Sequence, residues 1–150
     1  MKLKQIIYLF LISGILFSCV DNQKTAPKFN HLVEQFADIK VLRYKVPGFE
    51  ELSLKEKSLV YYLTQAGLAG RDIMWDQNYK HNLKIRAALE NINANYTGDK
   101  ETEDYKAFKV YLKRVWFSNG IHHHYSMAKI NPDFSADYLD SLLVATETSL

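Results

Sequence analysis

The sequence predicts a mainly α-helical domain behind an amino-terminal export signal. Three observations predict this fold class. Apolar residues recur at helical spacing through most of the chain after residue 52, capping and stop residues bracket these segments, and only one short stretch is β-branched enough for a strand. We therefore expect a mainly α fold with at most a short β segment near residues 41–46.

The first eighteen residues have the pattern of a signal peptide. Lys2 and Lys4 give a positive start, and an apolar run from Ile6 to Phe17 follows. A transmembrane helix needs about 20 apolar residues, whereas the apolar part of a signal peptide needs only about 7–15. Residues 1–18 are therefore expected to be removed during export.

Leu16-Phe17-Ser18-Cys19 resembles the lipobox of bacterial lipoproteins. Cys19 is the only cysteine, so no internal disulfide can form, although an ordinary buried thiol is the alternative. We expect lipidation of Cys19, with residues 19–28 as a tether to the folded part. The protein would then be exported and held at the cell envelope, with the outer membrane as its partner surface.

Composition excludes some classes of protein. Nineteen Lys and Arg against seventeen Asp and Glu are nearly balanced, so nucleic-acid binding has no electrostatic support. The residues that remain after removal of 1–18 suffice for one modest domain, and a second domain is not expected within this length. The ten tyrosines and eight phenylalanines fit either core packing or a ligand surface.

The first half of the mature chain predicts two helices and a strand. Apolar spacing predicts an amphipathic helix over 29–39, and β-branched residues favour a strand or extended link over 41–46. Ser53 and Glu56 form a capping-box pattern, which predicts a helix to about residue 68. Its expected inward face consists of Leu59, Val60, Leu63, Ala66 and Gly67.

The second half predicts three more helices after a connection at 71–76. They span residues 77–94, 103–118 and 135–143. Tyr79, Leu83, Ala87 and Ile92 form the expected stripe of the first. Thr102 is the expected N-cap of the second helix, and Asn119-Gly120 its stop.

Three consecutive histidines, His122, His123 and His124, follow that stop directly. Imidazole suits metal binding and proton transfer. In an extended segment, however, His122 and His124 would share one side and His123 would point away, and two nitrogens make a poor zinc site. A polar loop lining a cleft is the favoured interpretation, with a structural or solvated loop as the alternative.

Other candidates are weaker. Trp75, Asp76 and Tyr79 suit a sugar- or peptide-binding surface, and Arg71 and Asp72 suit the charged ends of a ligand, but a core aromatic and a local salt bridge are commoner. No His-Glu-x-x-His, Gly-x-Ser-x-Gly or phosphate-binding glycine loop occurs.

Four segments, in this order and spacing, resemble the amino-terminal part of the dipeptidyl peptidase III family, in its Bacteroidetes lipoprotein-like branch. They are FADIKVLRYKVPGF from Phe36, LVYYL from Leu59, GRDIMWDQN from Gly70 and VWFSNGIHHHYS from Val115.

The resemblance implies a two-lobed zinc exopeptidase that releases dipeptides from peptide amino termini. The family's zinc motif, His-Glu-x-x-Gly-His, lies downstream of the matched region and is not present in these 150 residues. It implies an amino-terminal fragment that is inactive alone, with no catalytic residue or zinc ligand of its own. Zinc would belong to the complete enzyme, where it polarises the carbonyl and activates water.

The resemblance also implies a substrate-binding segment. Ser118-Asn119-Gly120 matches the start of a family segment that borders the substrate cleft, whereas 121–126 departs from it. The expected peptide-binding residues are Asn119, Gly120, His122, His123, His124 and Tyr125.

Two other functions remain open at the level of sequence. The chain can be a small helical envelope lipoprotein that acts as a binding module, or a metal carrier that uses the histidine loop. If it is instead a fragment, helices meant to pack on a missing lobe leave apolar faces in water. We then expect marginal stability of the isolated segment.

Overall fold

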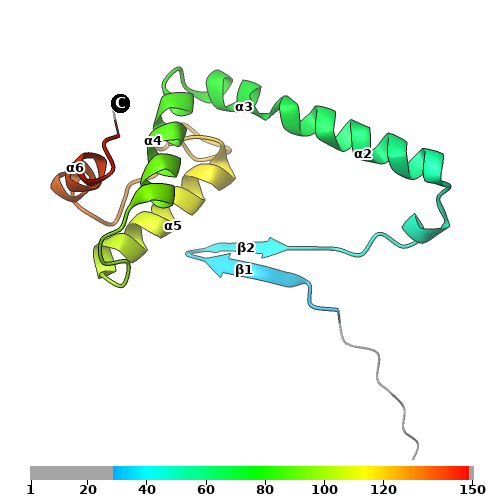
Figure 1. Ribbon diagram of the computed structural model, residues 1–150, viewed down its shortest axis with the longest axis horizontal. Helices are drawn as coiled ribbons and strands as arrows, with labels where there is room; N and C mark the ends of the chain where they lie inside the picture. The colour runs from blue at the N-terminus through cyan, green and yellow to red at the C-terminus, as the bar shows by residue number, and fades with distance from the viewer. Residues whose placement is uncertain (1–28, 149–150) are drawn as a thin grey trace, which may run out of the picture. The chain divides into compact units, whose positions relative to one another are not determined.

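The computed structural model describes residues 29–148. The expected signal peptide, the lipidation site Cys19 and the tether at 19–28 lie outside the described residues. The chain divides into two units, residues 1–31 and 32–150. The second unit is mainly helical and contains a short two-stranded antiparallel hairpin, as the sequence predicted in outline (Figure 1).

The elements of the second unit follow one another in this order: β1 (Leu32–Phe36), β2 (Ile39–Leu42), a 3-10 turn η1 (Phe49–Glu51), α2 (Leu54–Ala69), α3 (Arg71–Asn78), α4 (Asn82–Asn95), α5 (Glu103–Ser118) and α6 (Ala136–Ala145).

The helix predicted over 29–39 is wrong, because residues 32–36 form β1 and β2 begins at Ile39. Phe36 pairs with Ile39 across a tight turn in which Ala37 has a positive φ of 47°. The apolar spacing of so short a segment fits either element, and pairing decides between them. The predicted strand at 41–46 overlaps β2 only at its first two residues.

Ion pairs attach the hairpin to α5. Lys113 pairs with Glu34, and an Arg114 Nη2 lies 2.6 Å from Asp38 Oδ1. These side chains are partly or largely exposed, so each pair is worth little alone. Together they join β1 and its turn to one face of α5.

The capping box of α2 is confirmed. The Ser53 backbone N–H donates to Glu56 Oε2 at 2.8 Å, and the Glu56 N–H donates to Ser53 Oγ at 3.3 Å. The hydrogen bonds from Ser53 lower the pKa of the Glu56 carboxyl. The end near Gly70 is also confirmed, but α3 follows at once, so the connection predicted at 71–76 is helical instead.

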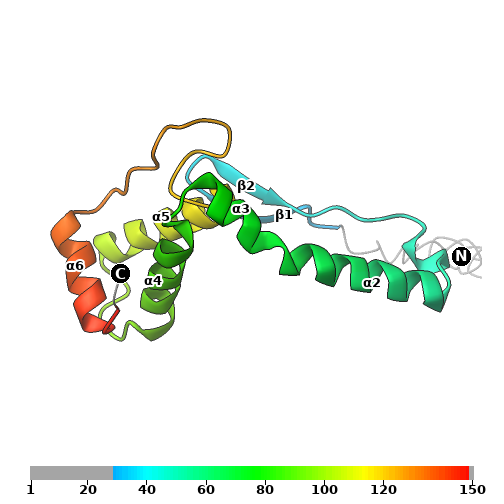
Figure 2. The same cartoon turned by 90° about the horizontal axis from the view of Figure 1, so that it is seen from above.

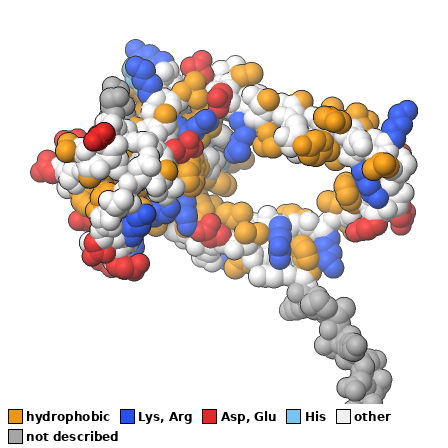
Figure 3. Space-filling model, in the orientation of Figure 1, with side chains coloured by type: hydrophobic (Ala, Val, Ile, Leu, Met, Phe, Trp, Pro, Cys, Tyr) orange, Lys and Arg blue, Asp and Glu red, His pale blue; other side chains and the backbone are white. Residues whose placement is uncertain are grey.

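The predicted inward face of α2 is not buried by any described residue. Its apolar side chains lie on all sides of the helix, and Leu54 is 80% and Leu63 62% exposed. In both views α2 extends from α3 away from α4, α5 and α6 (Figure 2), and apolar atoms cover much of its visible surface (Figure 3).

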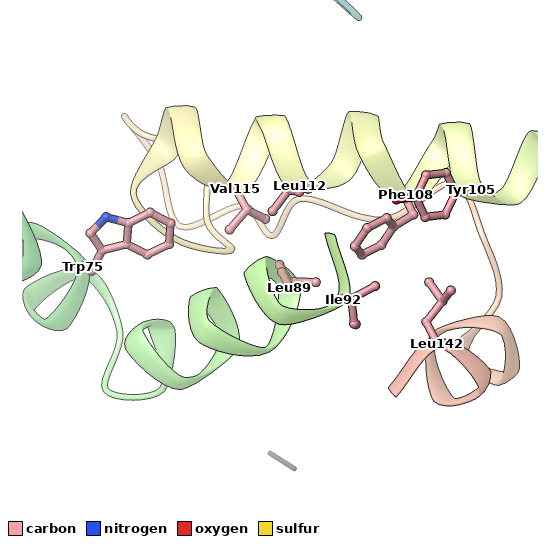
Figure 4. Packing of buried hydrophobic residues seen from close by; sticks show 8 residues of the cluster. All are labelled: Trp75, Leu89, Ile92, Tyr105, Phe108, Leu112, Val115 and Leu142. Atoms are coloured by element: carbon pink, nitrogen blue, oxygen red, sulfur yellow. The ribbon is translucent and has the colours of Figure 1, made fainter. Parts of the chain in front are cut away.

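The core lies where α3, α4, α5 and α6 meet, and α5 supplies half of its cluster (Figure 4). The buried cluster consists of Trp75, Leu89, Ile92, Tyr105, Phe108, Leu112, Val115 and Leu142. The bounds and caps of α5 are as predicted: the Thr102 side chain accepts a hydrogen bond from Tyr105 N–H, and Asn119 is left-handed. The predicted final helix is confirmed as α6, with Ser135 as its cap.

The helix predicted over 77–94 begins later than expected. Tyr79 lies just after α3, and α4 starts at Asn82. As a result Ala87 is exposed and its neighbour Ala88 is buried. The apolar stripe predicted for this helix was counted from Tyr79, which does not belong to α4, and it therefore included Ala87 instead of Ala88.

Candidate functional site

The three histidines lie at the start of a closed loop after α5. The N–H of Ile130 donates to the Ile121 carbonyl at 2.8 Å, and the N–H of His123 donates to the Ala128 carbonyl at 2.8 Å. Between them His122 and Lys129 form an antiparallel bridge. The segment is therefore a small hairpin, which fixes the directions of its side chains better than a free loop would.

The base of this loop is a sharp turn at Asn119 and Gly120. Asn119 has φ 53°, the left-handed cap that asparagine tolerates well, and Gly120 has φ 149°. A Cβ on Gly120 would overlap the side-chain amide of Asn82. Glycine is required here twice, by the backbone angle and by the close approach of Asn82.

Asn82 joins three segments of the chain beneath the loop. Its side chain is fully buried, and its Nδ2 donates to the Trp75 carbonyl at 3.0 Å. Its Oδ1 accepts from the Ile121 N–H at 3.3 Å. Because an unpaired buried amide would be costly, these bonds fix the end of α3, the start of α4 and the loop together.

His122 lies apart from the other two imidazoles. It is half-buried, its ring packs edge-on against Tyr79 with centroids 5.5 Å apart, and its Nδ1 is buried without a hydrogen-bond partner among the described residues. It lines a hollow of about 320 Å³ together with Asn78, the other two histidines and residues 125–127.

His123, His124 and Tyr125 form an exposed ring cluster. The His123 and His124 ring centroids are 4.3 Å apart, and His124 and Tyr125 are also 4.3 Å apart. His124 packs edge-on against Phe117 of α5. The expected geometry of an extended segment is wrong here, because the turn after His123 places its ring beside His124 instead of opposite it.

The imidazoles do not fit a zinc site. Among residues 29–148 no group of three or more His, Cys, Asp or Glu side chains is placed to hold a metal ion. His123 Nδ1 accepts a hydrogen bond from the Tyr125 N–H at 3.2 Å, and His122 is turned toward Tyr79. We therefore derive no metal-assisted step from this loop. The exposed rings and the half-buried His122 imidazole offer stacking surfaces and hydrogen-bonding groups.

The sequence-predicted site residues come together only in part. His122, His123, His124 and Tyr125 line one hollow, whereas Asn119 and Gly120 shape its base: the Asn119 carbonyl accepts from Asn78 Nδ2 at 3.3 Å. Asn78, Tyr79 and Asn82 were not predicted as part of this site. The spacing of Asn78 and Asn82 around a helix start offers no signal without the tertiary contact to residues 119–121.

The weaker candidates have mainly structural roles. Trp75 is 3% exposed and belongs to the core, so it is not a sugar-stacking surface. Asp72 pairs with Arg86 of α4 at 2.7 Å and not with its neighbour Arg71, so the salt bridge that forms is not the local one considered as the alternative. Asp76 is exposed, and Tyr79 packs between His81 and His122.

No model of a known protein family matches the chain, and no curated protein matches it either. Within residues 29–148, no helix combines the length and the apolar character needed to cross a membrane.

Proposed function

We propose that this chain is the amino-terminal part of a lipid-anchored, zinc-dependent dipeptidyl peptidase that releases dipeptides from peptide amino termini. In this proposal Cys19 carries the lipid, the chain is held at the outer membrane, and downstream residues hold the zinc. The loop at 118–126 forms one wall of the substrate cleft in a two-lobed enzyme. The chain is inactive without the zinc-bearing part.

The observation that carries the proposal is the ordered resemblance of four segments, and α2 supports it independently. The apolar residues of α2 are spread around the helix among polar ones such as Lys55 and Gln65, and none of them is buried among residues 29–148. One neighbouring helix cannot cover such a surface, because the apolar residues do not share one face. Further protein packed around α2, as in a larger lobe, accounts for this composition.

The loop also suits a peptide at the cleft. Exposed imidazole and phenol rings offer stacking surfaces as well as hydrogen-bond donors and acceptors, which a short peptide needs along its backbone. The base formed by Asn82 and Gly120 keeps these groups in place without any ligand. Such preorganisation lowers the entropic cost of binding.

The test uses the protein from the whole reading frame. His122→Ala and Tyr125→Phe should raise KM or lower kcat for dipeptide release, whereas Lys129→Ala, on the same loop but outside the hollow, should leave both unchanged. If the two loop variants match the unaltered enzyme in kcat and KM, the cleft role is wrong.

The second candidate is a helical envelope lipoprotein that acts as a binding module. The buried cluster shared by α3–α6 favours it, because that cluster is a core in its own right. The DNA after codon 150 separates the two. An open frame that encodes His-Glu-x-x-Gly-His supports the peptidase, and an immediate stop codon supports the module.

A further inference from the structure

A second hollow lies away from the histidine loop, between the end of α2 and helices α3, α4 and α5. Its volume is about 480 Å³, within the range of small-molecule sites. Both tryptophans of the chain, Trp75 and Trp116, line it, and so do Arg71 and Arg86. Trp75 stands at one end of the core beside α5 (Figure 4).

The carboxylates in this hollow are already engaged. Arg86 Nη1 lies 2.7 Å from Asp72 Oδ1, and Arg86 Nε lies 3.6 Å from Glu90 Oε1. The Trp116 indole N–H also donates to Glu90 Oε1 at 3.0 Å. Arg86 is further held over the Trp75 ring, 5.2 Å from its centroid. These contacts hold Asp72, Arg86 and Glu90, the polar wall of the hollow, in place. The charge of Arg86 is already balanced by the two carboxylates.

Arg71 differs from the other charged residues of the wall. It is exposed and forms no ion pair or side-chain hydrogen bond with any residue in the part of the chain that the structure describes. It also lines an adjoining hollow of about 290 Å³, where Lys113 is paired with Glu34. Its guanidinium therefore stands between two hollows with its hydrogen-bond donors available.

Besides the polar wall, apolar and aromatic residues line the hollows beside Arg71. Trp116 lines both hollows, and the second is bounded by Phe36, Val41 and Phe117. A ligand that suits this arrangement has a carboxylate for the planar, bidentate guanidinium and an apolar side chain for the aromatic walls. A peptide carboxyl terminus with an apolar last residue combines the two.

We propose that Arg71, with Trp116 beside it, binds the free carboxyl terminus of a short peptide that ends in an apolar residue. The site shares no residue with the histidine loop and needs neither zinc nor downstream protein. It therefore stands whether or not the chain belongs to a peptidase.

The test is a fluorescence titration of the full chain in detergent micelles. Because both tryptophans line the hollow, intrinsic emission reports directly on its occupancy. The probes are N-acetyl-Ala-Leu and its carboxyl amide, which differ only in the terminal carboxylate. We expect a saturable change with the acid and at least about tenfold weaker binding of the amide.

Variants locate the contact. Arg71→Gln should weaken binding of the acid at least about tenfold, and Arg71→Lys should retain part of it as a point charge. Lys84→Gln, an exposed cation on α4 that lines neither hollow, should bind as the unaltered chain does. Far-UV circular dichroism checks that each variant is folded. Equal binding of acid and amide, unchanged binding by folded Arg71→Gln, or no saturable signal at millimolar probe overturns the proposal.

Discussion

The side-chain amide of Asn82 lies so close to Gly120 that a Cβ at position 120 would overlap it, and either the amide or the backbone would have to shift. This contact joins the start of α4 to the turn after α5, which are far apart in the sequence. The candidate site depends on it, because the hydrogen bond from Ile121 N–H to Asn82 Oδ1 sets where the histidine loop begins.

Replacing Gly120 by alanine should destabilise the chain by at least about 2 kcal/mol, since φ 149° is strained for any residue with a Cβ. Urea unfolding followed by circular dichroism measures this change. Gly67→Ala is the matched control: a Cβ there meets open space in the last turn of α2, so helicity should rise. Equal stability of Gly120→Ala and the unaltered chain would refute the packing described for the turn.

Asn82→Ala should cost about 1–3 kcal/mol, because the Trp75 carbonyl and the Ile121 N–H lose their partner. It also removes the atoms that a Cβ at Gly120 would meet. In a double-mutant cycle, Gly120→Ala should therefore destabilise the Asn82→Ala variant less than it destabilises the unaltered chain. The expected coupling energy is about 0.5–3 kcal/mol. Strict additivity would mean that the two residues act independently.

Tyr138→Phe should leave stability unchanged or raise it. The Tyr138 hydroxyl is buried and makes no hydrogen bond of good geometry with a described residue, although Thr102 and Tyr96 lie close enough to shift its pKa. Its removal therefore loses little and relieves the desolvation penalty of the hydroxyl. Thermal unfolding is a sufficient measurement, with Tyr62→Phe on exposed α2 as the control. A loss above about 1 kcal/mol would show that the hydroxyl makes a stabilising contact.

Alkaline pH should destabilise the helical core. Burial raises the pKa of Tyr111, and burial followed by the neighbouring Tyr96 raises the pKa of Tyr105. Between the usual tyrosine pKa and these raised values, the folded state holds protons that the unfolded state has lost, so stability falls as pH rises above about 10. Tyr111→Phe should flatten that fall in urea titrations at pH 9 and 11. An identical slope in the variant would exclude this linkage.

Leu63→Glu on α2 should change the stability of this chain little and that of a complete peptidase much more. Leu63 is 62% exposed here, so the change should alter the stability of this chain by less than about 0.5 kcal/mol. In the protein from the whole reading frame it should cost several times more, because a buried charge would replace a packed leucine. Equally small effects in both would mean that α2 stays uncovered.

The sequence predicted those elements whose ends carry local signals. Ser53, Thr102 and Ser135 cap helices that begin within one residue of the prediction. The hairpin was missed because strand pairing between residues 32–36 and 39–42 is not visible in apolar spacing alone.

The sequence indicated that the histidine loop is a candidate site, but it did not predict the conformation of the loop. Three imidazoles after a helix stop are evident in the sequence, whereas the closure of the loop depends on Ile121, Ala128 and Ile130 pairing across it. Asn82 gave no signal at all, because its role rests on contacts with residues that are nearly forty positions away. Long-range contacts of buried polar groups are what the sequence alone cannot provide.

The most direct test of the proposed function is dipeptide release by the protein expressed from the whole reading frame that contains these residues. Mass spectrometry of a synthetic heptapeptide should show stepwise loss of amino-terminal dipeptides, which a chelator stops and added zinc restores, while residues 1–150 alone release none. Absence of dipeptide release from the zinc-loaded full-length protein, or a reading frame that ends at codon 150, would contradict the account.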